Sequence, residues 1–321
     1  MGNCIFCNGI QQNVFFEIKN ANSSFEILKC ENCNAYTLDP IPTETELAEV
    51  YNTGYYGKGG AKFILFVEYF VDAFRGIRAK RAINRIPQNG TVLDIGCGSG
   101  AFLNYLKKRY NFSLSGIEIK GDAAIRAADC NQGFELHIGF LQDIDFGIKT
   151  FDLITMYHVF EHLITPKEDI KKISSLIKNN GRLIISMPNI NSWQATLFKD
   201  KWFHLDFPRH LIFFKPKDFK EVMQLNGFYL ESEHYISWEQ NPFGYIQSSL
   251  NVVCKNQNFL YEFLKTNAKS NYTLSDWFQL SLQILFAGVT LPLFLIIDVF
   301  ESFFKKSATV EYTFKYQSKN D

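Results

Sequence analysis

The run TVLDIGCGSG at residues 91–100 places a single carboxylate, Asp94, just before three glycines at alternate positions. Such a turn lets the backbone approach a nucleotide closely, and a loose dinucleotide-binding fingerprint could use the same glycines. A pyrophosphate at the N-terminus of the following helix would, however, meet the negative charge of Asp94, so a cationic nucleotide suits this place better. Glu118 ends the next apolar run, 22 residues after Gly96, where an acid can accept hydrogen bonds from ribose hydroxyls.

Four cysteines near the start of the chain form two pairs with the same spacing, Cys4 with Cys7 and Cys30 with Cys33. Two such pairs can bring four thiolates to one point, which is the ligand set of a tetrahedral structural zinc ion. Metal binding also supplies folding free energy that so short a segment lacks. We therefore expect a structural Zn²⁺ in a zinc ribbon over residues 1–40, with four unrelated cysteines as the alternative.

Three residues of the segment YHVFEHL, His158, Glu161 and His162, spell H-x-x-E-H, which is the zinc-peptidase signature in inverted order. That signature needs a helix and a further ligand, whereas here the run closes a strand-like segment, FDLITMY, so we do not interpret it as a metal site. We expect His158 or His162 near the reactive end of a bound nucleotide. Histidines that only satisfy nearby backbone groups are the alternative.

Strand-like and helix-like segments alternate in the part of the chain that carries these residues. The predicted strands are TVLDI, LSGIEI, FELHIG, FDLITM and RLIISM, and the helices between them are AFLNYLKKRY, AAIRAADC and KEDIKKISSLIK. This alternation predicts a parallel sheet covered on both faces, with ligands at the carboxyl ends of the strands where the strand order reverses. Before it, residues 41–90 are expected to form a linker, a glycine-rich loop with Tyr56, and a helix over residues 61–86.

The run VLDIGCGSGAFL resembles motif I of class I S-adenosylmethionine-dependent methyltransferases. FDLITMYHVFEHL, NNGRLIISMPN and NGF with YLESEHY resemble the later strands of that family, so the match covers residues 91–235 in order. The resemblance implies a Rossmann-like α/β sheet, mostly parallel, whose last, antiparallel strand is ATVEYTFKYQ in the segment 308–321. It also implies S-adenosyl-L-methionine as cofactor and an acid, Asp143, near the adenine amino group. The expected cofactor-binding residues are Asp94, Gly96, Cys97, Gly98, Gly100, Glu118, Asp143 and Tyr56.

A cluster of polar and aromatic residues follows the fifth predicted strand, in the run KWFHLDFPRHL. Similar runs occur in the methyltransferase subfamily with an N-terminal cysteine ribbon, and a loop beyond the strand's carboxyl end is where an acceptor should lie. Methyl transfer needs an aligned acceptor and removal of its proton. His204, His210 and His158 are the candidate bases, and Arg209, Trp202 and His162 are the candidate acceptor-binding residues. The alternative is that Arg209, Asp206 and the histidines form a polar lock that holds the loop.

The most apolar segment, residues 277–306, lies within an expected insertion over residues 236–307. Gln283 and Pro292 interrupt it, and its clean stretch of 14 residues is about 21 Å long as a helix, against about 30 Å of bilayer core. Both ends of the insertion must return to one sheet, which predicts a helical hairpin. The hairpin could dip into one leaflet, pack on a partner or cover the protein's own core; Lys305 and Lys306 favour peripheral membrane contact.

Composition narrows the function further. Lys and Arg total 33, as do Asp and Glu, so no net charge favours nucleic acid as a partner. The first residues do not resemble a secretory signal, which predicts a cytoplasmic protein, at the inner face of the membrane if the apolar segment meets lipid. We expect a methyltransferase for a small molecule such as a sugar or a lipid-linked glycan precursor. A nicotinamide-dependent oxidoreductase and a non-catalytic zinc-ribbon interaction module are the alternatives.

Overall fold

The computed structural model describes residues 3–20, 23–43, 46–47, 65–84, 86–265 and 272–318. Tyr56 lies outside these residues. The larger of two sheets consists, in spatial order, of β10 (Phe228–His234), β11 (Thr309–Tyr316), β8 (Ile177–Pro188), β7 (Phe151–Tyr157), β4 (Thr91–Ile95), β5 (Ser113–Glu118) and β6 (Glu135–Ile138). The strands from β8 to β6 are parallel, and β11 is antiparallel to both of its neighbours. The predicted Rossmann-like sheet with an antiparallel last strand is thus confirmed.

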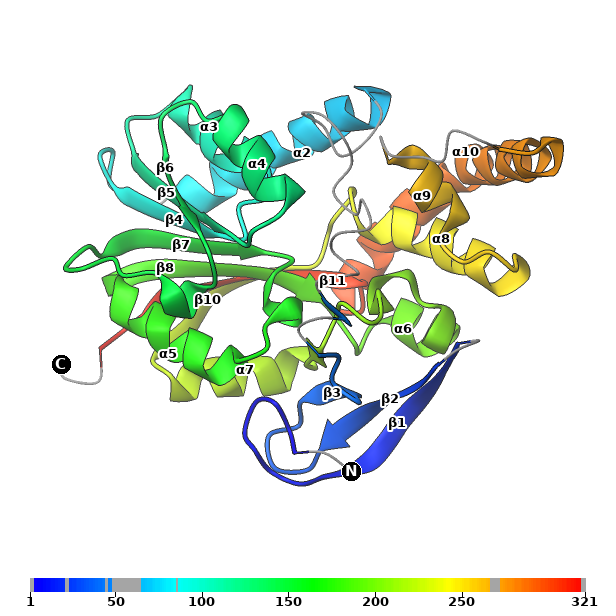
Figure 1. Cartoon of the computed structure of the whole chain (residues 1–321), viewed down its shortest axis with the longest axis horizontal. Helices are drawn as coiled ribbons and strands as arrows, with labels where there is room; N and C mark the ends of the chain where they lie inside the picture. The colour runs from blue at the N-terminus through cyan, green and yellow to red at the C-terminus, as the bar shows by residue number, and fades with distance from the viewer. Residues whose placement is uncertain are drawn as a thin grey trace.

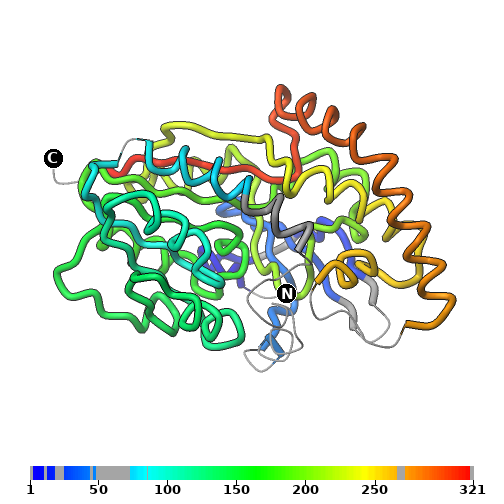
Figure 2. The backbone as a smooth tube through the Cα atoms, turned by 90° about the horizontal axis from the view of Figure 1, so that it is seen from above, coloured from blue at the N-terminus to red at the C-terminus, as the bar shows by residue number. Residues whose placement is uncertain are grey.

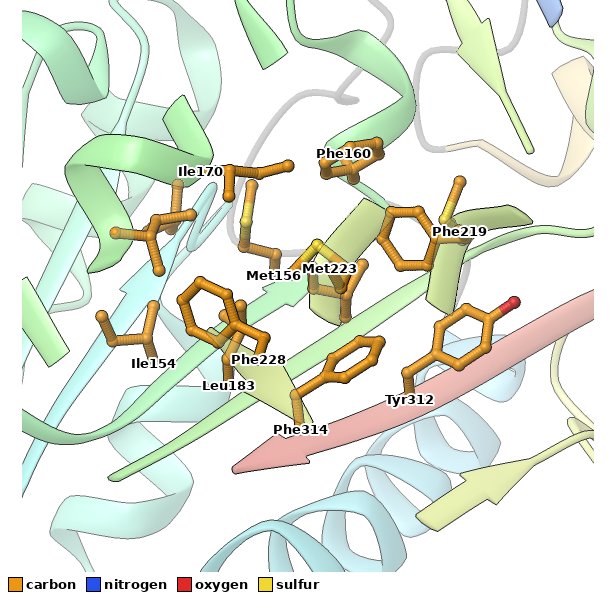
Figure 3. Close-up of a cluster of buried hydrophobic side chains, with 14 of the residues drawn as sticks. Ile154, Met156, Phe160, Ile170, Leu183, Phe219, Met223, Phe228, Tyr312 and Phe314 are labelled. Carbon is orange, nitrogen blue, oxygen red and sulfur yellow. The ribbon is translucent and has the colours of Figure 1, made fainter. Parts of the chain in front are cut away.

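Helices cover both faces of this sheet (Figure 1). One face carries α2 (Leu65–Ile83), α3 (Ala101–Lys107) and α4 (Asp122–Asp129), and the other carries α5 (Pro166–Leu176) and α7 (Pro216–Leu225). Successive strand residues point to opposite faces of the sheet, so Val92 packs against α2, α3 and α4, and Leu93 packs on the face covered by α5 and α7. Figure 3 shows the core between the sheet and the helices α5 and α7, where Phe219 of α7 lies near Phe228 of β10 and Phe314 of β11. Burial on both faces explains why the strands read as continuous apolar runs.

The cysteine-containing segment forms a second, four-stranded sheet that is joined to the rest of the chain. Its strands are β1 (Gln11–Asn20), β2 (Ser23–Cys30), β3 (Tyr36–Asp39) and β9 (Ile212–Phe213). The last of these strands comes from the polar loop after β8, and it pairs antiparallel with β3 through Tyr36 and Thr37. The ribbon therefore holds the segment that follows His210.

The insertion after β10 is a helical hairpin, as predicted, but its returning arm is longer than expected. The chain leaves the sheet through α8 (Asn241–Val253) and α9 (Phe259–Leu264) and returns through α10 (Leu274–Phe303), the long helix at the edge of the molecule in Figure 2. A single helix of 30 residues is about 45 Å long. The expectation of an apolar segment too short to span a bilayer was therefore wrong about its length.

Pro292 lies inside α10 without ending it. A proline removes one hydrogen bond from a helix interior, and α8 packs on both sides of that point, through contacts in a cluster that includes Phe286 and Phe294. The ring of Tyr245 stacks on that of Phe294 with centroids 4.9 Å apart. The other expected interruption, Gln283, is buried next to Cys254. Packing along the helix thus overrides the two local breaks.

Most of α10 has no cover from the described chain. Only 11% of its most apolar 18 residues are buried, and by length and composition alone the helix could cross a membrane. Its exposed large side chains include Leu285, Val289, Ile296 and Phe300. The two lysines at its end contact the protein instead of standing apart from it, since Lys305 pairs with Glu233 and Lys306 donates to the Asn191 carbonyl.

Candidate cofactor and acceptor site

One large cavity, of about 1910 Å³, opens at the carboxyl ends of β4, β5 and β7. The chain order reverses between β4 and β7, and such a reversal is where open α/β sheets bind their ligands. The cavity brings together most of the residues singled out from the sequence, including all three candidate acids and four histidines. They are Asp94, Gly96, Cys97, Gly98, Glu118, Asp143, His158, His162, His204 and His210.

Asp94 lies at the mouth of β4 and is 4% exposed. Its Oδ1 accepts a hydrogen bond of 2.6 Å from the Thr155 hydroxyl on the neighbouring β7, which fixes the carboxylate at the reversal point. Burial raises its pKa to about 7, although the hydrogen bond from Thr155 acts against that rise. A carboxylate held in this environment gains from a nearby cationic ligand, because the ligand favours its ionised form.

Glu118 ends β5 and faces the glycine turn across the cavity wall. Its two oxygens accept hydrogen bonds from the backbone N–H groups of Gly98 at 2.6 Å and Ile119 at 3.1 Å. Burial raises its pKa to about 7, and these two hydrogen bonds oppose the shift. Gly98 has φ +58°, and a Cβ there would meet no atom within 4 Å. The turn thus leaves open space beside an acid that can accept ribose hydroxyls.

The remaining cofactor candidates differ in what they face. Gly100 does not line the cavity; a Cβ at its position would lie 2.5 Å from the ring of the core residue Phe134, so the close contact of this glycine is with the core. Cys97 lines the cavity but is buried, and burial raises the pKa of its thiol. Asp143 ends the short helix η1 (Leu141–Asp143) at the cavity wall.

A histidine cluster surrounds one buried carboxylate at the other end of the cavity. Glu161, in the short helix η2 (Phe160–His162), is 0% exposed. Its Oε1 lies 3.4 Å from His158 Nδ1 and 3.9 Å from His210 Nε2. The histidines lower its pKa against the opposing effect of burial. Neither carboxylate oxygen has a hydrogen-bond donor among the described residues.

Two of these histidines bond to backbone carbonyls through Nδ1. His162 Nδ1 lies 2.9 Å from the Arg209 carbonyl oxygen, and His210 Nδ1 lies 2.8 Å from that of His204. A carbonyl accepts only, so each Nδ1 carries a proton, and Nε2 is the nitrogen that can accept a hydrogen bond when the ring holds a single proton. Burial, aided by the charge of His210, lowers the pKa of His162 to about 4.

Two of the candidate acceptor-binding residues, Arg209 and Trp202, and one candidate base, His204, are held by the protein itself. The Arg209 guanidinium makes a two-pronged ion pair with Asp206, and its side chain does not line the cavity. Trp202 is 2% exposed in the cluster between the ribbon and the core, also away from the cavity. His204 lines the cavity, but burial lowers its pKa to about 3. These contacts favour the polar lock that the sequence left open as an alternative.

The four ribbon cysteines converge, as their spacing predicts. The sulfurs of Cys4 and Cys33 are 3.6 Å apart, those of Cys7 and Cys30 are 3.5 Å apart, and all four lie within 4.8 Å of one another. Each pair sits in the same turn, since Asn8 N–H donates to the Cys4 carbonyl and Asn34 N–H to the Cys30 carbonyl. Four sulfurs at these separations match a tetrahedral thiolate site.

Several groups that complete the cavity were not predicted from sequence patterns. Arg78 of α2 lies over the Tyr157 ring at 5.0 Å and pairs with Glu239, which follows β10. Phe243 of α8 and Tyr261 of α9 close the cavity from the insertion. Arg78 and Glu239 are 161 positions apart in the chain, and no local sequence pattern predicts a contact between such distant segments.

Comparison with known proteins identifies the family of this chain. The sequence profile of the Methyltransferase domain family matches residues 69–233, which is more than half of the chain. The chain therefore belongs to this family.

Curated relatives act on quite different small molecules. The ubiquinone biosynthesis O-methyltransferase of Coxiella burnetii is 32% identical over 120 residues, which cover 36% of this chain and 51% of that protein. A dTDP-3-amino-3,4,6-trideoxy-alpha-D-glucopyranose N,N-dimethyltransferase of Streptomyces venezuelae is 25% identical over 168 residues, covering 52% and 65%. The chain thus spans between half and two thirds of the length of these relatives.

The fold also occurs in a solved structure with a different named activity. The [4+2]-cyclase SpnF is 13% identical and superposes with a TM-score of 0.53, covering 86% of this chain and 97% of that one. At this identity the likeness concerns the fold alone.

Proposed function

We propose that this protein transfers a methyl group from S-adenosylmethionine to a small molecule. The observation that carries the proposal is the pair of buried acids, Asp94 and Glu118, at the ends of adjacent strands on one cavity. Asp94 favours the cationic methionine end of the cofactor, and Glu118 takes the ribose hydroxyls in place of its present backbone donors. Asp143 is the acid for the adenine amino group.

His158 is our candidate for the general base. It follows β7 directly, lines the cavity, and its side chain is 24% exposed, whereas His204 and His210 are buried. Its Nδ1 lies 3.4 Å from Oε1 of Glu161, and a buried carboxylate beside an imidazole helps to orient the ring. The acceptor would lie between His158 and the methyl group, where the enzyme aligns the two reactants.

We propose a sugar or a lipid-linked glycan precursor as the acceptor, and a membrane surface as the place of reaction. The support comes from α10. Leu285, Val289 and Ile296 form one exposed stripe of this helix, while Ile284 and Leu291 are exposed on another side. A partner protein would cover one stripe, whereas lipid can solvate several sides.

Aromatic residues near both ends of α10 fit the same location. Trp277 is 48% exposed at its start, and Trp193 packs on Phe304 at its end with ring centroids 5.6 Å apart. Tryptophan is enriched at membrane–water interfaces. Because α8 packs along α10 and both arms return to one sheet, the hairpin would enter one leaflet from the cytoplasmic side instead of crossing.

The four ribbon cysteines, in this proposal, hold a structural zinc ion. All four ligand positions are taken by sulfur, which leaves no position for a substrate. Zinc would stabilise the ribbon and, through β3 and β9, the loop that carries His210.

Transfer of a labelled methyl group tests the proposed activity. The protein is incubated with methyl-labelled S-adenosylmethionine and a cell extract that has been separated into water-soluble and lipid fractions. We expect label in a small-molecule fraction, and a lipid-linked acceptor would place it in the lipid fraction. Cofactor binding without transfer to any fraction would favour the non-catalytic alternative, and reduction of NAD by a fraction would favour the oxidoreductase.

A further inference from the structure

The cluster around Glu161 contains a ligand set for a metal ion. One nitrogen each of His162 and His210 and one oxygen of Glu161 lie within 4.8 Å of one another. The ring centroids of the two histidines are 4.6 Å apart, and both rings line the cavity, with the carboxylate of Glu161 behind them. Two imidazoles and one carboxylate are a ligand set that binds divalent transition metals and leaves positions open.

The backbone fixes this arrangement from both segments. Leu211 N–H donates to the Glu161 carbonyl at 2.7 Å, and the Arg209 carbonyl accepts from His162 Nδ1. These two contacts set the register between η2 and the loop before β9. In metal sites a ligating histidine commonly donates its other N–H to a carbonyl or carboxylate, which orients the ring. His162 and His210 both show that second contact.

The state of Glu161 is the observation that points to a missing ligand. A carboxylate with no exposure and without a hydrogen-bond donor in the described chain is costly, because buried charges are normally paired and bonded. The nearby histidines offer partial compensation, at 3.4 Å and 3.9 Å. A cation among them would satisfy the carboxylate fully. Ligand atoms on one such ion are about 3.3 Å apart, so a shift of about an ångström would close the site.

We propose that Glu161, His162 and His210 bind a divalent transition-metal ion that coordinates the methyl acceptor. This inference rests on the proposed function and deepens it, because it assigns the acceptor atom to oxygen. The ion would make an acceptor hydroxyl that binds to it more acidic, and His158 would receive the proton. The acceptor oxygen would then form its bond to the methyl carbon as the carbon–sulfur bond breaks, with the electron pair of that bond staying on sulfur in S-adenosylhomocysteine.

The sequence motif alone could not show this site. H-x-x-E-H supplied Glu161 and His162, but the third ligand lies 48 residues beyond His162 and is brought back only by the loop before β9. His158, the first residue of the motif, is not in the ligand set and is left to act on the acceptor.

Cobalt binding tests the proposal independently of methyl transfer. Co²⁺ is titrated into the full-length protein with zinc retained in the ribbon, and both metals are counted per chain by elemental analysis. Cobalt bound to thiolates has intense charge-transfer absorption that nitrogen and oxygen ligands lack, so the spectrum separates the two sites. We expect one cobalt per chain without thiolate absorption, and at least about tenfold weaker binding in Glu161→Gln and in His210→Ala, since outer contacts alone are worth that much.

The control is His234→Ala, which removes an exposed histidine of β10 and should leave cobalt binding unchanged. Binding of S-adenosylhomocysteine and the melting temperature confirm that each variant is folded. If the wild-type protein takes up no cobalt beyond the ribbon, or if Glu161→Gln binds it as tightly as the wild type, the proposal is wrong. A protein that binds cobalt here but transfers no methyl group would instead contradict the proposed function.

Discussion

At the scale of single residues, the cavity holds two buried acids whose ionised forms a bound cofactor would stabilise. Asp94 and Glu118 both have pKa values raised to about 7 by burial. Without a ligand, each therefore holds a proton more readily than an exposed carboxyl group. A bound sulfonium compound reverses that preference for Asp94, and ribose hydroxyls donate best to an ionised Glu118.

The affinity for S-adenosylmethionine should therefore depend on pH. Because the raised pKa values belong to the ligand-free protein, protons must leave on binding below about pH 7, and the affinity rises with pH between about 5 and 7 and is level above. The same shifts make the fold more stable at the acidic end of this window. Calorimetry in buffers of different ionisation enthalpy counts the released protons; a flat affinity with no proton release would refute the assignment.

Asp94→Asn keeps the size of the side chain and removes its charge. Loss of a charged hydrogen-bonding group costs about 1.5–3 kcal/mol, so we expect the dissociation constant of the cofactor to rise about 10- to 100-fold. The conservative control is Asp145→Asn, at an acid that only accepts from the Gly147 N–H in a loop. Equal affinity in both variants would show that the Asp94 carboxylate does not face the cofactor.

At the scale of elements, the ribbon and the helical hairpin lie at the periphery of the molecule, and each is connected to the wall of the cavity. The β3–β9 pairing joins the cysteine cluster to the loop that carries Asp206, Arg209 and His210. On the other side, Asn241 of α8 donates to Asp298 of α10 and accepts from Thr309 N–H of β11. The ribbon and the hairpin therefore help to position the residues on the acceptor side of the cavity more than they position Asp94 or Glu118.

Removal of the ribbon metal should accordingly affect transfer more than cofactor binding. We expect Cys33→Ser to lower the melting temperature by at least about 5 °C and to slow methyl transfer severalfold, while affinity for S-adenosylhomocysteine changes little. Cys130→Ser, at an exposed cysteine that follows α4 and lies outside the four-sulfur cluster, is the matched control. A Cys33 variant with wild-type stability and unchanged metal content would show that the sulfurs hold no zinc.

The exposed face of α10 makes a separate prediction about lipid. The double change Leu285→Glu and Ile296→Glu places two charges on side chains that are 64% and 68% exposed, so folding should tolerate it. We expect binding to vesicles with anionic lipid to fall by at least about tenfold, because burying a charge in the interface is costly. Ile148→Glu, at a fully exposed isoleucine elsewhere, controls for charge alone. If the wild-type protein does not sediment with vesicles, the proposed contact of α10 with a membrane is wrong.

At the scale of the whole molecule, much of the architecture follows from patterns along the chain. The strands that carry Asp94 and Glu118 were predictable because each is an apolar run that ends in an acid, and the antiparallel β11 followed from a family resemblance. The pairing of β9 with β3 could not be predicted, since a strand of two residues shows no alternating pattern. The same limit hid the approach of His210 to Glu161. Pro292 led to the opposite error, because the sequence predicted an interruption where the helix continues. A proline does weaken a helix locally, but packing of α8 on both sides of Pro292 supports α10 there.

The most direct test of the central claim is calorimetric titration of the purified protein with S-adenosylhomocysteine and, separately, with NAD. We expect saturable binding of S-adenosylhomocysteine at one site per chain, lost or strongly weakened in Asp94→Asn, and no measurable binding of NAD. Binding of NAD in preference to S-adenosylhomocysteine would contradict it.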